Sequence, residues 1–143
     1  LLTGAVDGAG RDELLAPGGY APFHELHEGE LHPKVAAIVD GSFLDRDPPG
    51  IRGGGYVVDA LEAALWAVHR HDDFEAAVLA ATNLGDDADT TAAIAGQLAG
   101  AICGVEGIPA AWRERVVLAD EIIGLADGLL ALADEVDPEA ERL

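Results

Sequence analysis

The sequence has 143 residues, with no methionine, one cysteine and few aromatic side chains, and these shortages limit what the chain can be. A single thiol, Cys103, excludes a disulfide framework and any CxxC motif. Because it lies in an apolar run, we expect a buried, unreactive thiol in a reducing, cytoplasmic protein. The first four residues lack an initiator methionine and the basic and apolar regions of a signal peptide. We therefore expect a fragment, a processed product or part of a longer protein.

Basic residues are also scarce. Eight Lys and Arg residues stand against 27 Asp and Glu residues, which gives a formal net charge of −19. Nucleic acids are excluded as partners by this balance because phosphate binding needs a basic surface. Anionic membrane surfaces are disfavoured for the same reason. A cation, in contrast, is a plausible ligand for such a chain.

Long hydrophobic runs and strand patterns are absent. The most apolar segment, 92–104, is shorter than the ~20 residues of a membrane-spanning helix and contains Gln97. We expect it to form a buried core helix. Alternating β-branched or aromatic residues do not occur, and Ala and Leu dominate the periodic segments. The fold class is therefore predicted to be all-α, as one compact multi-helix domain over residues 1–143.

Apolar residues at spacings of three and four, together with caps and breakers, predict where the helices lie. Helices are expected over 11–16, from Pro33 through Val39 to an end near Gly41, over 56–69, from Asp73 to Asn83, and over 87–103 and 116–135, with a short helix around Trp112. Residues 20–32 are read as a loop or a short helix. Asp73 is expected to cap the helix that follows it, and Trp66 and Trp112 are expected in the core or an interface. Glycines spaced by four in the 87–103 helix and just after it imply close approach by a neighbouring helix or a ligand, since each costs ~1 kcal/mol relative to Ala. The 56–69 helix is expected to bury a stripe made of Val57, Ala60, Leu61, Ala64, Leu65 and Val68, with Asp59, Glu62 and Ala63 on its other faces. The last helix is expected to bury a stripe of five residues. These are Leu118, Ile122, Leu125, Leu129 and Leu132.

One segment has the composition of a chemical site. Residues 83–91 carry three carboxylates and two hydroxyls at the start of the expected central helix. Carboxylate and hydroxyl oxygens are hard ligands suited to Mg²⁺, Mn²⁺ or Ca²⁺. Asp87 and Asp89 can converge on one cation where the chain turns into the helix, and Thr90 can add a neutral oxygen. Helix capping is the alternative interpretation, and it accounts for one acid more easily than for three.

Two other metal motifs fit this segment poorly. An EF-hand loop that starts at Asp87 requires Gly and Glu where Ala92 and Leu98 stand. The pattern Asp87-x-Asp89-x-Thr91 also resembles the nucleophile motif of haloacid-dehalogenase-type phosphatases, but no apolar strand precedes it and no α/β pattern follows.

A second group of metal-binding residue types lies at His24, His27 and His32, among glutamates. A Zn²⁺ site is conceivable there, although the order is not HExxH. A solvated acidic loop is the favoured interpretation. His69 and His71, at a helix end, are interpreted as structural. Asp59 is interpreted as a residue on the polar face of its helix. The alternative is that it contacts the metal ligands without binding the metal itself.

The acidic segment also belongs to a longer pattern. The residues that carry it are GDDADTTAAIAG (85–96), GA (100–101), GIP (107–109) with Trp112, and GGGYVVDALEAALW (53–66). In this order and spacing they resemble the C-terminal half of the ADP-ribosylglycohydrolase family, which includes dinitrogenase reductase-activating glycohydrolase. The resemblance covers about residues 33–116.

This resemblance implies a compact all-helical fold and a site for two divalent cations, Mg²⁺ or Mn²⁺. It assigns Asp87, Asp89 and Thr90 as metal ligands, with Asp87 and Asp89 catalytic and Asp89 in contact with both ions. Gly55 and Tyr56 match a segment that lines the ADP-ribose cleft. Asp86 is expected behind the ligands or as a capping residue.

The function that the resemblance implies is metal-dependent hydrolysis that removes ADP-ribose from modified proteins or small molecules. Family members are about twice this length, and their N-terminal half carries another acid cluster that is not recognisable here before Gly53. We therefore expect the N-terminal half to be a separate chain, or a homodimer to cover the exposed surface. The alternative is a catalytically incomplete helical fragment that acts as a binding or assembly module.

Overall fold

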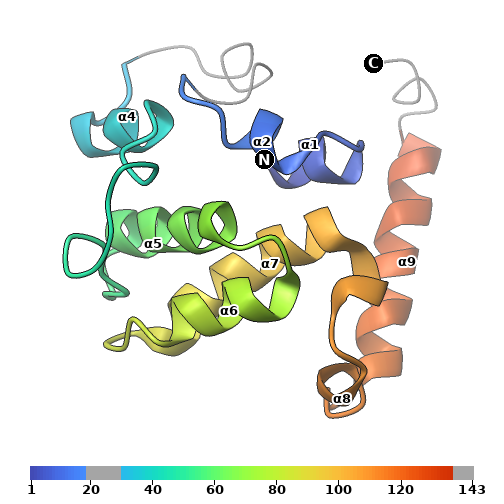
Figure 1. Cartoon of the computed structure of the whole chain (residues 1–143). Coiled ribbons are helices and arrows are strands. Elements are labelled where there is room, and N and C mark those ends of the chain that lie inside the picture. Colours follow the sequence, from blue (N-terminus) through green and yellow to red (C-terminus); the bar gives the residue numbers. More distant parts are fainter. Residues whose placement is uncertain (19–29, 137–143) are drawn as a thin grey trace. The chain divides into compact units, whose positions relative to one another are not determined.

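The structure is a computed structural model that describes residues 1–18 and 30–136, and every regular element in these ranges is a helix. Figure 1 shows the eight described helices. They are α1 (Leu2–Val6), α2 (Arg11–Leu14), α4 (Pro33–Val39), α5 (Val57–Arg70), α6 (Phe74–Thr82), α7 (Ala88–Gly107), α8 (Ala110–Arg113) and α9 (Ala119–Val136). The predicted all-α class is confirmed. The loop or short helix expected over 20–32 lies largely outside the described residues.

The chain divides into two compact units, Leu1–Pro109 and Ala110–Leu143. The first unit holds α1 to α7 and the second holds α8 and α9. A single domain over residues 1–143 therefore stays a prediction. No described helix is both long enough and apolar enough to cross a membrane.

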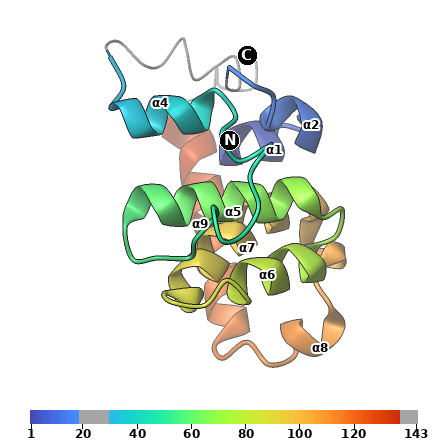
Figure 2. The same cartoon turned by 60° about the vertical axis from the view of Figure 1, so that its left-hand side comes forward.

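The core of the first unit is formed by α5, α6 and α7, which pack against one another in pairs (Figures 1 and 2). Helix α5 is buried over a wider surface than its predicted stripe, since Ala63 and Ala67 are fully buried as well. The reason is that α5 contacts α4, α6 and α7, so more than one of its faces is covered. Val57, predicted to begin the stripe, is instead exposed at the first residue of the helix.

Helix α7 is central, as predicted, and contacts α1, α5 and α6. Its glycines face α6, because a Cβ at Gly96 would lie 3.8 Å from Val78 Cγ2 and one at Gly100 would lie 3.7 Å from Phe74 Cε2. A neighbouring helix lies opposite these two positions, as predicted, but an added methyl group would be at ordinary van der Waals distance, so this packing does not require glycine. Gly104 has φ 68° and kinks the helix. Cys103, just before the kink, is half-buried rather than fully buried as predicted.

Side-chain contacts tie the helices and loops of the first unit together. The Asp73 carboxylate caps α6 by accepting the Ala76 N–H at 2.8 Å, as predicted. Arg11 reaches from α2 to the chain after α5 and forms an ion pair with Asp72. The hydrogen bond to the Asp72 carboxylate raises the pKa of Arg11. The buried Trp66 donates from Nε1 to Asp47 Oδ1 at 3.2 Å, so the expected core position of this side chain is confirmed.

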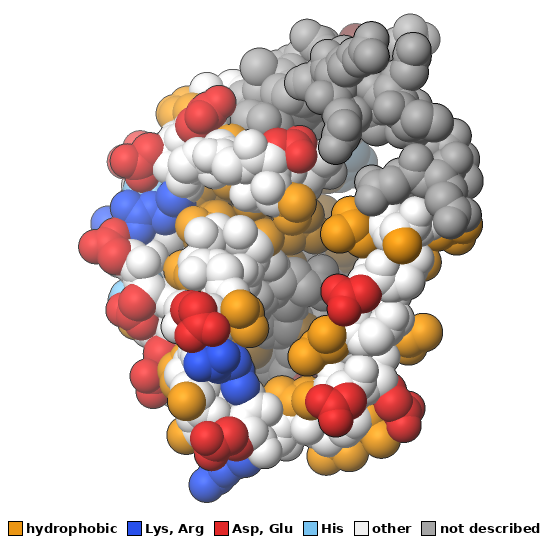
Figure 3. Space-filling model, turned by 90° about the vertical axis from the view of Figure 1, so that its right-hand side faces the viewer, with side chains coloured by type: hydrophobic (Ala, Val, Ile, Leu, Met, Phe, Trp, Pro, Cys, Tyr) orange, Lys and Arg blue, Asp and Glu red, His pale blue; other side chains and the backbone are white. Residues whose placement is uncertain are grey.

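The second unit corrects one prediction. The five residues expected as the core stripe of α9 are all exposed, by 53 to 70 %. Within this unit the other described helix, α8, has four residues and is too short to cover an 18-residue helix. Periodicity identified the helix correctly, but burial also requires a neighbouring element. Figure 3 shows hydrophobic side chains exposed beside acidic ones on one face of the molecule.

Candidate functional site

The predicted site begins at a tight turn between α6 and α7. Gly85 and Asp86 both have left-handed backbone angles, with φ 77° and 52°. Aspartate is one of the few residue types with a side chain that tolerates this conformation. The two residues reverse the chain direction, and Asp87 then stands at the N-cap position of α7. Asp86 itself is exposed and lines a cavity of about 540 Å³ together with Arg52 and Trp66.

The main chain of Asp87 is held from two sides. Its N–H donates to the carbonyl of Gly53 at 2.8 Å, which ties the turn to the glycine loop before α5. Its carbonyl accepts from the N–H of Thr91 at 3.1 Å and from the Thr91 hydroxyl at 3.0 Å. Thr91 is fully buried. The position of Asp87 is therefore fixed by backbone contacts, and its carboxylate is not needed to hold it there.

The glycine loop approaches the acidic turn closely enough to explain its composition. A Cβ at Gly53 would lie 3.0 Å from the Gly85 carbonyl oxygen and 3.1 Å from Leu84 Cβ. One at Gly55 would lie 3.2 Å from Asp87 Oδ2. Gly55 and Asp87, predicted from separate motifs 32 residues apart, are thus brought together. A side chain at Gly53 would crowd the backbone of the turn, and one at Gly55 would displace the Asp87 carboxylate by a few tenths of an ångström.

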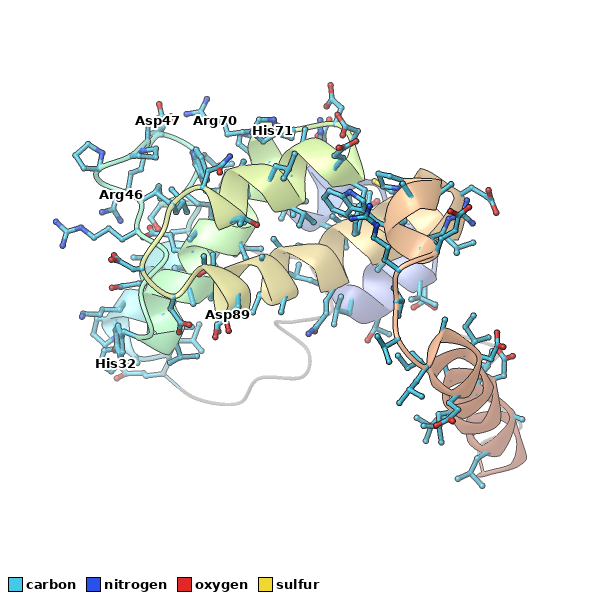
Figure 4. All side chains as sticks on the ribbon, turned by 90° about the horizontal axis from the view of Figure 1, so that it is seen from below. His32, Arg46, Asp47, Arg70, His71 and Asp89 are labelled. Carbon is cyan, nitrogen blue, oxygen red and sulfur yellow. The ribbon has the colours of Figure 1, made fainter. Side chains whose placement is uncertain are left out.

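The other predicted ligands lie on the first turn of α7. Asp89 and Thr90 are both exposed, whereas Asp87 is half-buried. In the view of Figure 4, Asp89 projects from the start of α7 on the side opposite Asp47 and Arg70.

Tyr56 precedes α5 directly, next to Gly55, and the residue is 45 % exposed. The Lys34 ammonium lies 4.7 Å from the centroid of that ring, in a cation–π contact. An exposed aromatic ring beside the Gly55–Asp87 contact suits the lining of a ligand cleft. The substrate-binding role of Gly55 and Tyr56 stays a prediction.

The oxygen donors of this turn fit a hard divalent cation in kind. The Asp87 side chain makes no capping hydrogen bond to α7. None of Asp86, Asp87 and Asp89 forms an ion pair with a described residue. Among the described residues, however, no three His, Cys, Asp or Glu side chains gather into a metal-binding group. Two carboxylates and a hydroxyl are fewer than the six ligands of octahedral Mg²⁺, so the rest must come from water, substrate or residues outside this set.

Other sequence-based interpretations have mixed outcomes. His32 caps α4, because its Nδ1 accepts the Lys34 N–H at 3.3 Å. His24 and His27 lie outside the described residues, so the Zn²⁺ alternative stays untested. His69 has a structural contact, an edge-to-face packing against Phe43 with ring centroids 6.1 Å apart.

One polar cluster was missed. The Glu62 carboxylate, only 13 % exposed, accepts from Ser42 and Arg46 on the chain before α5. Its only signal in the sequence is that three of the eight basic residues, Lys34, Arg46 and Arg52, fall close together.

Comparison with known proteins decides the family. A family model described as ADP-ribosylglycohydrolase matches residues 1–139. The chain belongs to the ADP-ribosylglycohydrolase family. The resemblance predicted from residues 33–116 is thereby confirmed and extended to nearly the whole chain.

Three members of the ADP-ribosylglycohydrolase family show how far the similarity reaches. The chain is 44 % identical over 133 residues to ADP-ribosylarginine hydrolase Tri1 of Pseudomonas putida (strain GB-1), covering 93 % of this chain and 33 % of that protein. The hydrolase of the same name from Serratia proteamaculans (strain 568) is 39 % identical over 137 residues, covering 96 % and 35 %. ADP-ribosyl-[dinitrogen reductase] glycohydrolase of Rhodospirillum rubrum is 39 % identical over 84 residues, covering 57 % and 29 %.

A solved structure extends the comparison to the fold. A chain of an ADP-ribosylglycohydrolase-related protein complex superposes with a TM-score of 0.75 at 41 % identity, covering 87 % of this chain and 41 % of that one. The coverages of the three relatives show that the chain spans about a third of the length of the curated proteins it matches. It corresponds to one part of an ADP-ribosylglycohydrolase fold.

Proposed function

We propose that this chain provides Asp87, Asp89 and Thr90 as metal ligands to a hydrolase that removes ADP-ribose from modified arginine side chains of proteins. The arginine linkage is proposed because the two relatives that match more than nine tenths of the chain are named ADP-ribosylarginine hydrolases. The observation that carries the site is the close approach of Gly55 to a half-buried Asp87 carboxylate that makes no capping hydrogen bond. Such a carboxylate is free to bind a cation.

Hydrolysis of this linkage requires a water oxygen to bond to ribose C1 while the C1–N bond to the guanidinium group breaks. The leaving nitrogen takes up a proton, and the water loses one. A pair of Mg²⁺ or Mn²⁺ ions would hold ribose hydroxyls and stabilise the developing charge. On this chain, Asp87 and Asp89 would hold the ions and accept the water proton, and Thr90 would add a neutral oxygen. Tyr56 would present its exposed ring to the ADP-ribosyl group.

The remaining ligands are proposed to come from polypeptide beyond the described acids, because Asp87 and Asp89 are too few to hold two cations alone. A second polypeptide or a second copy of the chain meets this need equally. The choice between Mg²⁺ and Mn²⁺ and the cytoplasmic location stay predictions.

The test is release of ADP-ribose from an ADP-ribosylarginine protein, with and without Mn²⁺ or Mg²⁺. One arm uses the chain alone, and another adds the part of the Pseudomonas relative that the chain does not match. We expect metal-dependent release in at least one arm. Asp89→Ala is expected to reduce metal affinity and release by about 100-fold or more without unfolding the chain.

Asp73→Ala is the matched control. It also removes an aspartate from the start of a helix, but this aspartate caps the helix and lies outside the candidate site. It is expected to lower stability by about 1 kcal/mol and to leave release per folded molecule unchanged. Release that is unaffected by Asp89→Ala would refute the site assignment. Absence of release in every arm, with all proteins folded, would instead favour a non-catalytic binding or assembly module.

A further inference from the structure

A cavity separate from the acidic turn lies in the first unit, between α4, α5 and the loop that joins them. Its volume is about 410 Å³. Six of its lining residues are polar or charged. They are Lys34, Ser42, Arg46, Arg52, Asp59 and Glu62. Three of the eight basic residues of the whole sequence therefore face one cavity, in a chain whose net charge is −19.

One acid and one base of this cluster, Glu62 and Arg46, neutralise each other. Arg46 donates from Nη1 to both carboxylate oxygens of Glu62, at 2.8 and 2.7 Å. Its Nη2 donates to the Gly50 carbonyl at 2.7 Å, and the Ser42 hydroxyl also donates to Glu62. The Arg46 guanidinium is thus held in a fixed orientation on the cavity wall, with further N–H donors left over.

The other two basic side chains have no such partner. Neither Lys34 nor Arg52 forms an ion pair with any residue in the described ranges. Arg52 donates from Nε to the Pro49 carbonyl at 3.3 Å, which leaves the two terminal nitrogens of its guanidinium unused. Because Asp59 is the remaining acid, the cavity lining carries a net charge of about +1. A basic cavity in so acidic a chain favours an anionic ligand.

Tyr56 stands next to both the cavity and the candidate site. Lys34 lines the cavity, and its ammonium lies 4.7 Å from the Tyr56 ring centroid. Tyr56 also follows Gly55, where an added Cβ would lie 3.2 Å from Asp87 Oδ2. The cavity and the candidate site are therefore neighbours in the fold.

We propose that this cavity binds an anionic oxygen group, a phosphate or a carboxylate, of the molecule whose ADP-ribosyl group occupies the candidate site. The identity of that molecule rests on the proposed function, but binding of an anion in the cavity does not. Two sources offer this chemistry. They are the diphosphate of ADP-ribose and an acidic side chain on the modified protein. Arg46, Arg52 and Lys34 provide charge-assisted hydrogen bonds to either one.

The test is a titration of the ¹⁵N-labelled chain with inorganic phosphate at low ionic strength, without divalent metal. Backbone amide shifts that saturate are expected at Ser42, Arg52 and Asp59. Lys34→Gln and Arg52→Gln are each expected to weaken phosphate binding by about tenfold, because each removes one charged donor. Arg115→Gln is the matched control, since it removes the same charge from an exposed residue outside the cavity, and it should leave phosphate binding unchanged.

Competition then identifies the source of the anion. If ADP-ribose displaces phosphate from the cavity, the natural anion is the diphosphate of ADP-ribose. If only a glutamate-rich peptide displaces it, the natural anion is an acidic side chain of the modified protein. Absence of saturable shifts, or equal affinity in Lys34→Gln, Arg52→Gln and Arg115→Gln, overturns the proposal. Asp89→Ala should bind phosphate normally, so loss of ADP-ribose release in that variant stays separable from failure of the anion site.

Discussion

Asp73 and Asp87 occupy the same position at the starts of neighbouring helices, yet only Asp73 uses its side chain there. Its carboxylate accepts an N–H of the first turn of α6, whereas that of Asp87 makes no such bond. The main chain of Asp87 is fixed by the Gly53 carbonyl and by Thr91 instead. Capping therefore does not account for Asp87, and the proposal that it binds a cation is strengthened.

The contact between Gly55 and Asp87 gives a sharp prediction. A methyl group added in Gly55→Ala would lie 3.2 Å from Asp87 Oδ2, so the carboxylate must move by a few tenths of an ångström. We expect Mn²⁺ affinity to fall by about 10-fold or more, as for other groups that orient metal ligands. Gly54→Ala is the control, because a Cβ there meets nothing within 4 Å. Isothermal titration calorimetry measures the Mn²⁺ affinity of both variants, with the unmatched part of the Pseudomonas relative added if the activity test shows that it is needed. Equal affinities for the two variants would contradict the role of Gly55.

Single residues differ in how well the sequence alone could place them. The Asp73 cap follows from local pattern, since an aspartate before an apolar helix satisfies an N–H three residues later. The Gly55–Asp87 contact joins two motifs that were recognised separately, but the sequence could not supply its distance. Glu62 was read as a residue on an outer face of its helix. Its burial against Arg46 depends on how the loop before α5 folds back, which no local spacing encodes.

At the scale of elements, the helix positions were largely predictable because their boundaries are set locally. Pro33 and the Asn83–Gly85 breakers stand where helices start or end. Helix α4 starts at Pro33 as predicted and ends at Val39, two residues before the expected end near Gly41. Burial was less predictable, because it depends on neighbours. Helix α5 is buried on more faces than its predicted stripe. The predicted stripe of α9, in contrast, is exposed.

The glycines of α7 allow a prediction about this element. Gly100→Ala places a methyl group in ordinary contact with Phe74, at 3.7 Å, and removes a poor helix former. We expect the free energy of unfolding to rise by about 0.5–1 kcal/mol. Gly104→Ala is the counterpart, since no atom lies near its Cβ but its φ of 68° is unfavourable for alanine. It should lower stability by about 1–2 kcal/mol.

Urea unfolding followed by circular dichroism measures both changes, with the slope against urea concentration held constant as the check that the unfolded states match. Destabilisation by Gly100→Ala would mean that α6 and α7 pack more tightly than the 3.7 Å contact indicates. Unchanged stability in Gly104→Ala would mean that the kink relaxes into a straight helix at no cost.

At the scale of the whole molecule, charge is the dominant property. A net charge of −19 opposes compaction. Ion pairs of Arg11, Arg46 and Arg70 offset part of it, but eight basic residues are far fewer than the 27 acids. Two effects of cations therefore have to be separated. Any salt screens the repulsion, but only a specific site responds to Mg²⁺ or Mn²⁺ beyond the effect of ionic strength.

Thermal stability in NaCl and in MnCl₂ distinguishes these two effects. Thermal unfolding in NaCl should shift to higher temperature as ionic strength rises, because screening weakens the repulsion between acids. At matched ionic strength, MnCl₂ should raise the stability further, by about 2.7 kcal/mol when the free ion is at 100 times its Kd. Asp89→Ala should keep the NaCl effect and lose the Mn²⁺ increment. An increment that survives in Asp89→Ala would show that Mn²⁺ acts on the acidic surface in general, because a stabilisation that needs no particular carboxylate cannot come from a site built on Asp87 and Asp89.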